Sequence, residues 1–166
     1  MATLKQIRGR IKAAKNIQQI TKAMKLVAAA RLKKATDRVL EARPYADKMR
    51  ELMGSISSAG ELPAHPLREK RPVRAVGLIL VTADRGLAGG YNTNLIRKAV
   101  EFVRNSAVPV KVIGVGKKGH GFLAKRGSDV VFTHTVSSAG ATVADAEIVA
   151  SRARKMYESG EVDAVY

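Results

Sequence analysis

The sequence predicts an α/β protein in which a long, kinked N-terminal coiled-coil helix precedes an incomplete parallel-sheet domain. Two observations favour this fold class. Apolar residues follow a heptad pattern over the first 58 residues, and short apolar runs alternate with helical segments over 75–166. A Pro/Gly-rich stretch separates these regions. We therefore expect a shaft helix at 1–58, a linker at 59–74 and an α/β domain at 75–166 that is truncated at its fourth strand.

The heptad pattern places apolar residues at alternating spacings of three and four. This repeat is typical of a helix that packs against another helix. A helix of this length spans roughly 80 Å at about 1.5 Å per residue, so a 166-residue globule cannot bury all of it. We therefore expect a partner helix or socket outside these residues. The seam residues are Ile7, Ile11, Ile17, Ile20, Val27, Leu32 and Val39.

Pro44 lies inside the heptad pattern. Proline removes one backbone hydrogen bond from a helix, but the pattern continues in phase to Ile56. The sequence therefore predicts a kink near 40–44 and a helix end near Ser57, Ser58 and Gly60.

The period of the apolar pattern changes after residue 74. A nearly continuous apolar run at 75–81 is typical of a strand that is covered on both faces. Strands that alternate with helices predict a parallel sheet. The other expected strands are 110–115, 130–132 and 163–166, and the expected helices are 95–105, 117–126 and 142–159, the last capped by Gly160.

The net charge of +16 is concentrated near the N-terminus. Residues 1–38 hold eleven Lys and Arg against one acid, which gives +10. One interpretation is a solvated face, and the other is a polyanionic partner such as an acidic protein, a nucleic acid or an anionic lipid. The expected basic face consists of Lys22, Lys25, Arg31, Lys33 and Lys34.

Two glycine-rich turns follow predicted strands. Gly114, Gly116 and Gly119 match the Rossmann-like dinucleotide fingerprint, but Asp129 precedes the next strand, where the ribose-binding acid should follow it. A tight strand-to-helix turn is the favoured interpretation, and a nucleotide-binding enzyme is the alternative. The loop at 84–92 lacks the Lys-Ser/Thr ending of a phosphate-binding loop and predicts a scaffold turn or a contact surface.

Other chemistry has little support in the sequence. There is no cysteine, and His65, His120 and His134 lack the spacing of metal ligands. Ser137, Ser138 and Thr142 have no suitable histidine partner for a nucleophilic triad. No run approaches the roughly 18 apolar residues of a membrane span. We expect no catalytic residue, no metal and no cofactor.

Four segments together resemble the gamma subunit family of F-type ATP synthases. They are the start at 4–11, the stretch ITKAMKLVAA at 20–29, Arg43-Pro44-Tyr45, and the loop DRGLAGGYN at 84–92. Some relatives have cysteine in place of Ala88. The resemblance implies that the chain is roughly the first three-fifths of a member. It also implies that the missing C-terminal helix is the partner of the seam.

The resemblance implies a mechanical and non-catalytic role. Members form the central rotor stalk, which couples proton-driven rotation to conformational change at catalytic sites on a ring of alpha and beta subunits. The α/β domain would lie against the epsilon subunit and the c-ring. The chain would be peripheral on the cytoplasmic face of the bacterial cell membrane, with membrane contact only through the c-ring.

The expected contact residues lie on the first helix and on the loop at 84–92. The resemblance places Met24 and this loop near an acidic lever segment of the beta subunits, which the basic residues would also meet. The expected set is Lys22, Met24, Lys25, Arg31, Arg85, Gly86, Ala88 and Gly89. No nucleic acid is expected as a partner, although a basic nucleic-acid-binding protein is the other alternative to the rotor role.

Overall fold

The computed structural model describes residues 3–58, 65–69, 71–137 and 140–166. The chain separates into two compact units, Met1–Leu62 and Pro63–Tyr166, and each is described by itself. Gly60 and Pro63 of the predicted linker lie outside the described residues. The division into a shaft, a linker and a domain at the predicted boundaries stays a prediction.

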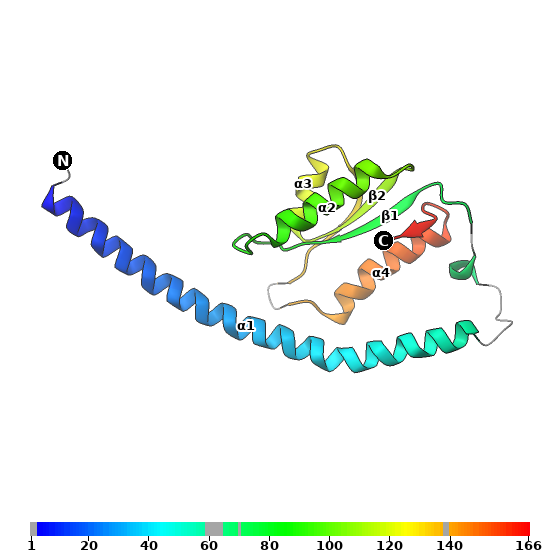
Figure 1. Ribbon diagram of the computed structural model, residues 1–166, viewed down its shortest axis with the longest axis horizontal. Coiled ribbons are helices and arrows are strands. Elements are labelled where there is room, and N and C mark those ends of the chain that lie inside the picture. The colour runs from blue at the N-terminus through cyan, green and yellow to red at the C-terminus, as the bar shows by residue number, and fades with distance from the viewer. Residues whose placement is uncertain (1–2, 59–64, 70, 138–139) are drawn as a thin grey trace. The chain divides into compact units, whose positions relative to one another are not determined.

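The first unit is built on one helix, α1, which spans Leu4–Ser58. Thr3 caps its start: the Gln6 backbone N–H donates to Thr3 Oγ1 at 3.4 Å, and the Thr3 N–H donates to Gln6 Oε1 at 3.0 Å. This reciprocal pair is a capping box. Pro44 lies inside α1, so the prediction that the helix continues through it is confirmed. The ribbon of α1 changes direction in its cyan part (Figure 1).

The apolar seam of α1 is exposed along its length. The exposed fraction is 45% at Ile7, 60% at Ile17 and 69% at Leu32. Two ion pairs, each between residues about one helical turn apart, support the second half of the helix. Lys48 Nζ lies 2.6 Å from Glu51 Oε2, and Arg50 Nη1 lies 2.5 Å from Asp47 Oδ1. Because exposed pairs contribute little, α1 has no large internal source of stability.

The second unit contains a four-stranded parallel sheet in the order β3-β2-β1-β4. Its strands confirm the predicted parallel sheet. The strand β3 is longer than the predicted 130–132 at both ends, because Asp129, Thr133 and His134 also pair with β2. Asp129 is therefore the first residue of β3, where the sequence predicted that it precedes the strand. The strands are β1 (Val76–Val81), β2 (Val110–Val115), β3 (Asp129–His134) and β4 (Ala164–Val165).

Helices cover both faces of this sheet. They are α2 (Tyr91–Asn105), α3 (Lys117–Ala124) and α4 (Val143–Glu158), and a short 3₁₀ turn, η1 (Pro66–Arg68), falls within the predicted linker. Figure 1 shows α2 and α3 together on one face and α4 on the other. Within the described residues, none of the helices is long and apolar enough to cross a bilayer.

The helix ends differ from prediction for local reasons. α2 begins four residues before the predicted 95, because the Asn94 N–H already donates to Gly90 O at 2.9 Å. α3 ends at Ala124, before the predicted Arg126. The backbone N–H groups of Arg126 and Gly127 donate to carbonyls three residues back, and Gly127 is left-handed (φ +76°), so the chain reverses direction there. Gly160 follows α4 with φ +74°, so the predicted glycine cap is confirmed.

The core lies in two clusters, one on each face of the sheet. Under α2 and α3, Leu123 and Val112 are completely buried, with Leu80 and Ala99 beside them. Under α4, the buried residues are Ile113, Met156, Val162 and Ala153. The alternating directions of residues along β2 supply both clusters.

Arg71, near the start of the second unit, binds residues near its C-terminal end. Its Nε lies 2.7 Å from Asp163 Oδ1, it donates to the carbonyls of Tyr157 and Val162, and its guanidinium lies 4.4 Å from the Tyr157 ring centroid. Asp163 also accepts from the Arg74 N–H at 2.7 Å, and this hydrogen bond is the main cause of its lowered pKa. The described residues from Arg71 onward therefore belong to the folded unit.

Candidate contact surfaces

The four predicted contact residues on α1 are all exposed, but they do not share one side of the helix. At 3.6 residues per turn, Met24 and Arg31 lie on the same side, two turns apart. Lys22 and Lys25 lie on a different side, because two residues rotate the position by about 200° and one by about 100°. The expected single basic face is therefore wrong: the positive charge surrounds the helix.

These charges are not neutralised within the helix. Lys22, Lys25 and Arg31 form no ion pair with any residue in the part of the chain that the structure describes. Their field therefore extends into solvent around an apolar seam that is itself exposed. An apolar stripe flanked by positive charge fits a protein surface that supplies both apolar contacts and carboxylates.

The loop between β1 and α2 is fixed at both of its ends. The Ala83 N–H donates to Asn92 Oδ1 at 2.9 Å, and the Tyr91 N–H donates to Ala88 O at 3.2 Å. The Tyr91 hydroxyl donates to Val81 O at 3.4 Å, which ties the start of α2 to the end of β1. The loop is therefore anchored to the sheet at its base.

The tip of this loop projects into solvent. The predicted contact residues Arg85, Gly86, Ala88 and Gly89 lie together in the tip, and all are exposed. Gly89 has φ +55°, a conformation that favours glycine, whereas nothing in the structure explains glycine at position 86.

Leu87 was not among the predicted contact residues. Its side chain is 96% exposed and its φ is +60°, which costs a residue with a Cβ roughly 1–2 kcal/mol. An exposed leucine in a strained tip, on an anchored base, is typical of a contact point. The available signal in the sequence was a large apolar side chain inside a glycine-rich loop, between Gly86 and Gly89.

The helix start that a dinucleotide would use is occupied by the chain itself. Backbone N–H groups at a helix N-terminus bind the pyrophosphate in dinucleotide sites. Here the Lys117 N–H donates to Asp84 Oδ1 at 2.9 Å, and the Lys118 N–H to Ala83 O at 3.1 Å. The Gly119 N–H donates to Thr82 Oγ1 at 2.8 Å. The Asp84 carboxylate therefore lies where the dinucleotide fingerprint would place a phosphate.

Close packing accounts for the three glycines of the fingerprint. A Cβ on Gly116 (φ +87°) would lie 2.0 Å from Thr82 O, and one on Gly119 would lie 2.6 Å from Thr82 Cγ2. A Cβ on Gly114 would lie 2.3 Å from His120 Cβ. The glycines let α3 approach the end of β1, which favours the tight-turn interpretation over nucleotide binding.

His134 has a carboxylate partner that the sequence analysis missed. Its Nε2 lies 2.8 Å from Asp145 Oδ1. The Thr142 hydroxyl, the His134 ring and the Thr142 backbone all donate to Asp145, and these hydrogen bonds, that of the Thr142 hydroxyl first, lower the pKa of Asp145 to about 2. This arrangement caps α4.

Histidines and acids do not gather elsewhere in the described segments. No group of three or more His, Cys, Asp or Glu side chains there could hold a metal ion. Ser138 lies outside the described residues. Two exposed surfaces, α1 and the tip of the loop after β1, are thus the candidate functional features.

The fold joins a parallel α/β unit to a helix far longer than any in that unit. The chain belongs to the ATP synthase family, whose sequence model matches residues 3–166. It is 40% identical over 166 residues to the ATP synthase gamma chain of Desulfitobacterium hafniense, covering 100% of this chain and 59% of that one. It is 43% identical over 173 residues to the gamma chain of Chloroherpeton thalassium, covering 100% and 57%. The chain thus spans somewhat under three-fifths of the length of these relatives.

A solved structure is also similar. It is a cryo-EM structure of the central stalk/cring of the Tetrahymena thermophila mitochondrial ATP synthase, with a TM-score of 0.60 and 25% identity. The match covers 82% of this chain and 59% of that one.

Proposed function

We propose that this chain forms the N-terminal part of a gamma chain and serves in the central rotor stalk of an ATP synthase. In this role it would couple proton-driven rotation to conformational change at catalytic sites on an alpha–beta ring. It would itself be non-catalytic. The family membership and the likeness to a central stalk support the proposal.

One observation carries the mechanical part of the proposal. The 55-residue helix α1 exposes a heptad seam that is interrupted by neither Pro44 nor a turn. Such a seam suits an antiparallel partner helix, which would make a stiff two-helix shaft. A shaft acts on a ring by differential contact, because each orientation stabilises a different conformation of each surrounding subunit.

The proposed contact residues lie on the exposed surfaces of α1 and of the loop after β1. Met24 and Arg31 would meet the ring from one side of α1, and Lys22 and Lys25 from another, so that charge faces the ring in every orientation. Arg85, Gly86, Ala88 and Gly89 would contact an acidic segment of the beta subunits, with Leu87 as the apolar point of that contact. Many weak, solvated contacts suit a sliding surface.

The remaining partners are proposed from the family. The α/β unit would contact the epsilon subunit and the c-ring, which would be the only route to the membrane. The chain would then lie at the cytoplasmic face of a bacterial cell membrane. The similar mitochondrial structure is of a central stalk and c-ring, which supports a place for this chain beside a c-ring.

Charge reversal on α1 tests the proposal. Lys22, Lys25 and Arg31 are changed together to Glu in a gamma chain of full family length that contains these residues. Coupling of proton flow to ATP synthesis in reconstituted vesicles is expected to fall, because attraction to acidic segments becomes repulsion. Each single reversal is expected to change little, since an exposed ion pair contributes about 0–1 kcal/mol. Met24→Lys is expected to weaken coupling more than a single reversal.

The matched control reverses three exposed lysines of the α/β unit, Lys98, Lys118 and Lys125, and so makes the same change in net charge. Synthesis and hydrolysis of ATP are measured side by side. If the α1 triple and Met24→Lys both leave proton-coupled synthesis at the level of the unmodified chain, these residues do not transmit torque and the contact assignment fails.

A further inference from the structure

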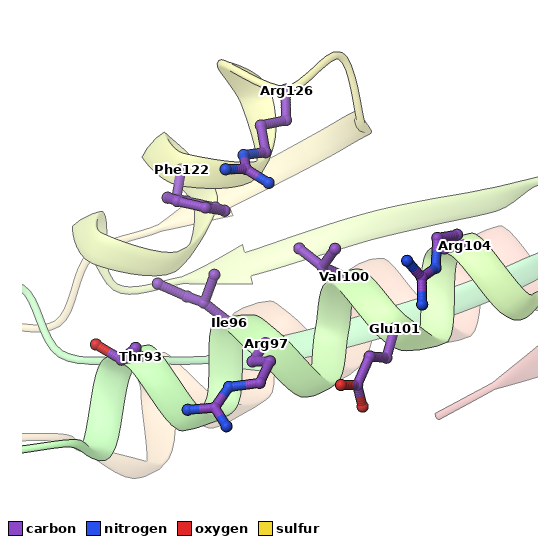
Figure 2. Close-up of a pocket in the computed structure, with 8 residues that line it drawn as sticks. All are labelled: Thr93, Ile96, Arg97, Val100, Glu101, Arg104, Phe122 and Arg126. Atoms are coloured by element: carbon purple, nitrogen blue, oxygen red, sulfur yellow. The ribbon is translucent and has the colours of Figure 1, made fainter.

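A groove runs between α2 and α3 on the outer side of the α/β unit. It has a volume of about 430 Å³. Figure 2 shows Ile96 and Val100 rising from α2 toward α3, with Phe122 of α3 above them. These three side chains form an apolar floor that solvent can reach.

The side chains of this apolar floor are only partly buried by the core. Phe122 is 36% exposed, whereas its neighbour Leu123 is completely buried in the cluster beneath α3. Ile96 is only partly buried and does not join that cluster. Burying these apolar surfaces under a ligand would therefore be favourable.

The edges of the groove are positively charged. Three arginines, Arg97, Arg104 and Arg126, line it against one acid, Glu101. The Arg126 guanidinium lies 4.6 Å from the Phe122 ring centroid, and Arg97 donates to Asn94 Oδ1 at 3.1 Å. Arg104 forms no ion pair with a residue in the described ranges. The groove therefore combines an apolar floor with an excess of cations able to bind carboxylates.

The groove is elongated along α2. Its residues on α2 recur from Thr93 to Arg104 at spacings of one, three and four, which is one stripe of the helix. This stripe extends for roughly 17 Å at about 1.5 Å per residue. An extended stripe fits another helix lying along the groove better than a compact small molecule does.

We propose that the α2–α3 groove binds an acidic amphipathic helix of a partner protein. Apolar residues of that helix, spaced at i, i+3 or i+4 and i+7, would pack on Ile96, Val100 and Phe122. Carboxylates beside them would pair with Arg104 and Arg126. The groove is made of other residues than α1 and the loop after β1, so the proposal goes beyond the contacts with the alpha–beta ring.

The test uses the whole chain and a helical peptide of about 18 residues with a leucine stripe flanked by glutamates. The peptide has a photo-reactive group on its stripe, and crosslinks are mapped by mass spectrometry. Because α1 is also basic and apolar, it is expected to attract some of the peptide. Crosslinks to 93–104 and 122–126 are the result expected from the groove. Crosslinks confined to α1 would overturn the proposal and leave the rotor role untouched.

Paired variants measure the contribution of charge. Arg104→Glu with Arg126→Glu is expected to reduce crosslinking to the groove and to weaken binding there about tenfold. Lys98→Glu with Lys155→Glu makes the same change in net charge outside the groove and is expected to leave groove crosslinks unchanged. Equal loss in both variants would show non-specific attraction and overturn the proposal.

Two further probes distinguish an amphipathic helix from other molecules that could occupy the groove. A peptide of the same composition without the leucine stripe is expected not to crosslink to the groove, and equal crosslinking would overturn the proposal. Decanoate is a small anionic amphiphile. If decanoate binds the groove while the helical peptide does not, the site takes small molecules and the proposal is wrong.

Discussion

Helix α1 and the α/β unit use apolar residues in opposite ways. The α/β unit buries Ile113, Leu123 and Met156 completely, on two faces of one sheet. In α1, Ile17 and Leu32 remain 60% and 69% exposed. One unit thus has a core of its own, whereas the other depends on capping, alanine content and local ion pairs. An apolar repeat therefore identifies a surface that needs to be covered, but it does not identify what covers it.

Removing a core side chain should show the largest difference between the two units. Leu123→Ala is expected to destabilise the α/β unit by about 2–5 kcal/mol, because it leaves a cavity beneath α3. Leu32→Ala in α1 is expected to change stability by no more than about 0.5 kcal/mol. Hydrogen exchange resolved by peptide measures each unit separately along a urea series. Equal losses of stability would show that the exposed seam of α1 stabilises its unit as much as the buried core stabilises the α/β unit, contrary to this expectation.

The same glycine substitution should have opposite signs in the two units. Gly116→Ala is expected to cost at least about 2 kcal/mol, because φ is +87° and the new Cβ would meet Thr82 O. Gly54→Ala in α1 is expected to stabilise the helix by about 0.5–1 kcal/mol, since nothing lies within 4 Å of the new Cβ.

Circular dichroism at 222 nm during thermal unfolding, together with hydrogen exchange of α1 and β2 peptides, gives both signs. A harmless Gly116→Ala would show that the turn at the start of α3 is looser than the contacts with Thr82 indicate.

The smallest expected effect is a loss of stability of the α/β unit at low pH. Asp145 has its pKa lowered from 3.8 to about 2 by hydrogen bonds, so its stabilising contribution is complete above about pH 4 and is lost as pH falls through 2. Wild type should therefore be more stable than Asp145→Asn near neutral pH, and the difference should shrink between pH 4 and 2. Thermal midpoints of both chains across this range measure it. A difference that stays constant down to pH 2 would contradict the role assigned to the Thr142 and His134 hydrogen bonds.

The sequence predicted the architecture because its periodic signals are strong. The heptad continued in phase through Pro44, and the apolar run at 110–115 became β2 with the same bounds. Strand β3 is longer than predicted because Asp129, Thr133 and His134 are polar residues that nevertheless pair with β2. Its apolar pattern could not show that.

Sites were harder to predict than elements. The glycines at 114, 116 and 119 matched a motif, yet the contacts with Thr82 and His120 that require them join segments far apart in the chain. The distribution of charge around α1 follows from helix geometry and could have been derived from the positions of Lys22 and Arg31. The exposure of Leu87 depends on how the loop is anchored, which the sequence does not reveal.

If this chain turns as part of a rotor, as proposed, its rotation can be observed directly. Because the sequence has no cysteine, Ala107→Cys places a single thiol at an exposed turn between α2 and β2. In a gamma chain of full family length that contains these residues and is otherwise free of cysteine, a probe on this thiol is followed in single complexes whose alpha–beta ring is fixed to a surface. ATP is expected to drive unidirectional, stepwise rotation of the probe. A probe that stays fixed relative to the ring while the same complexes hydrolyse ATP would contradict it.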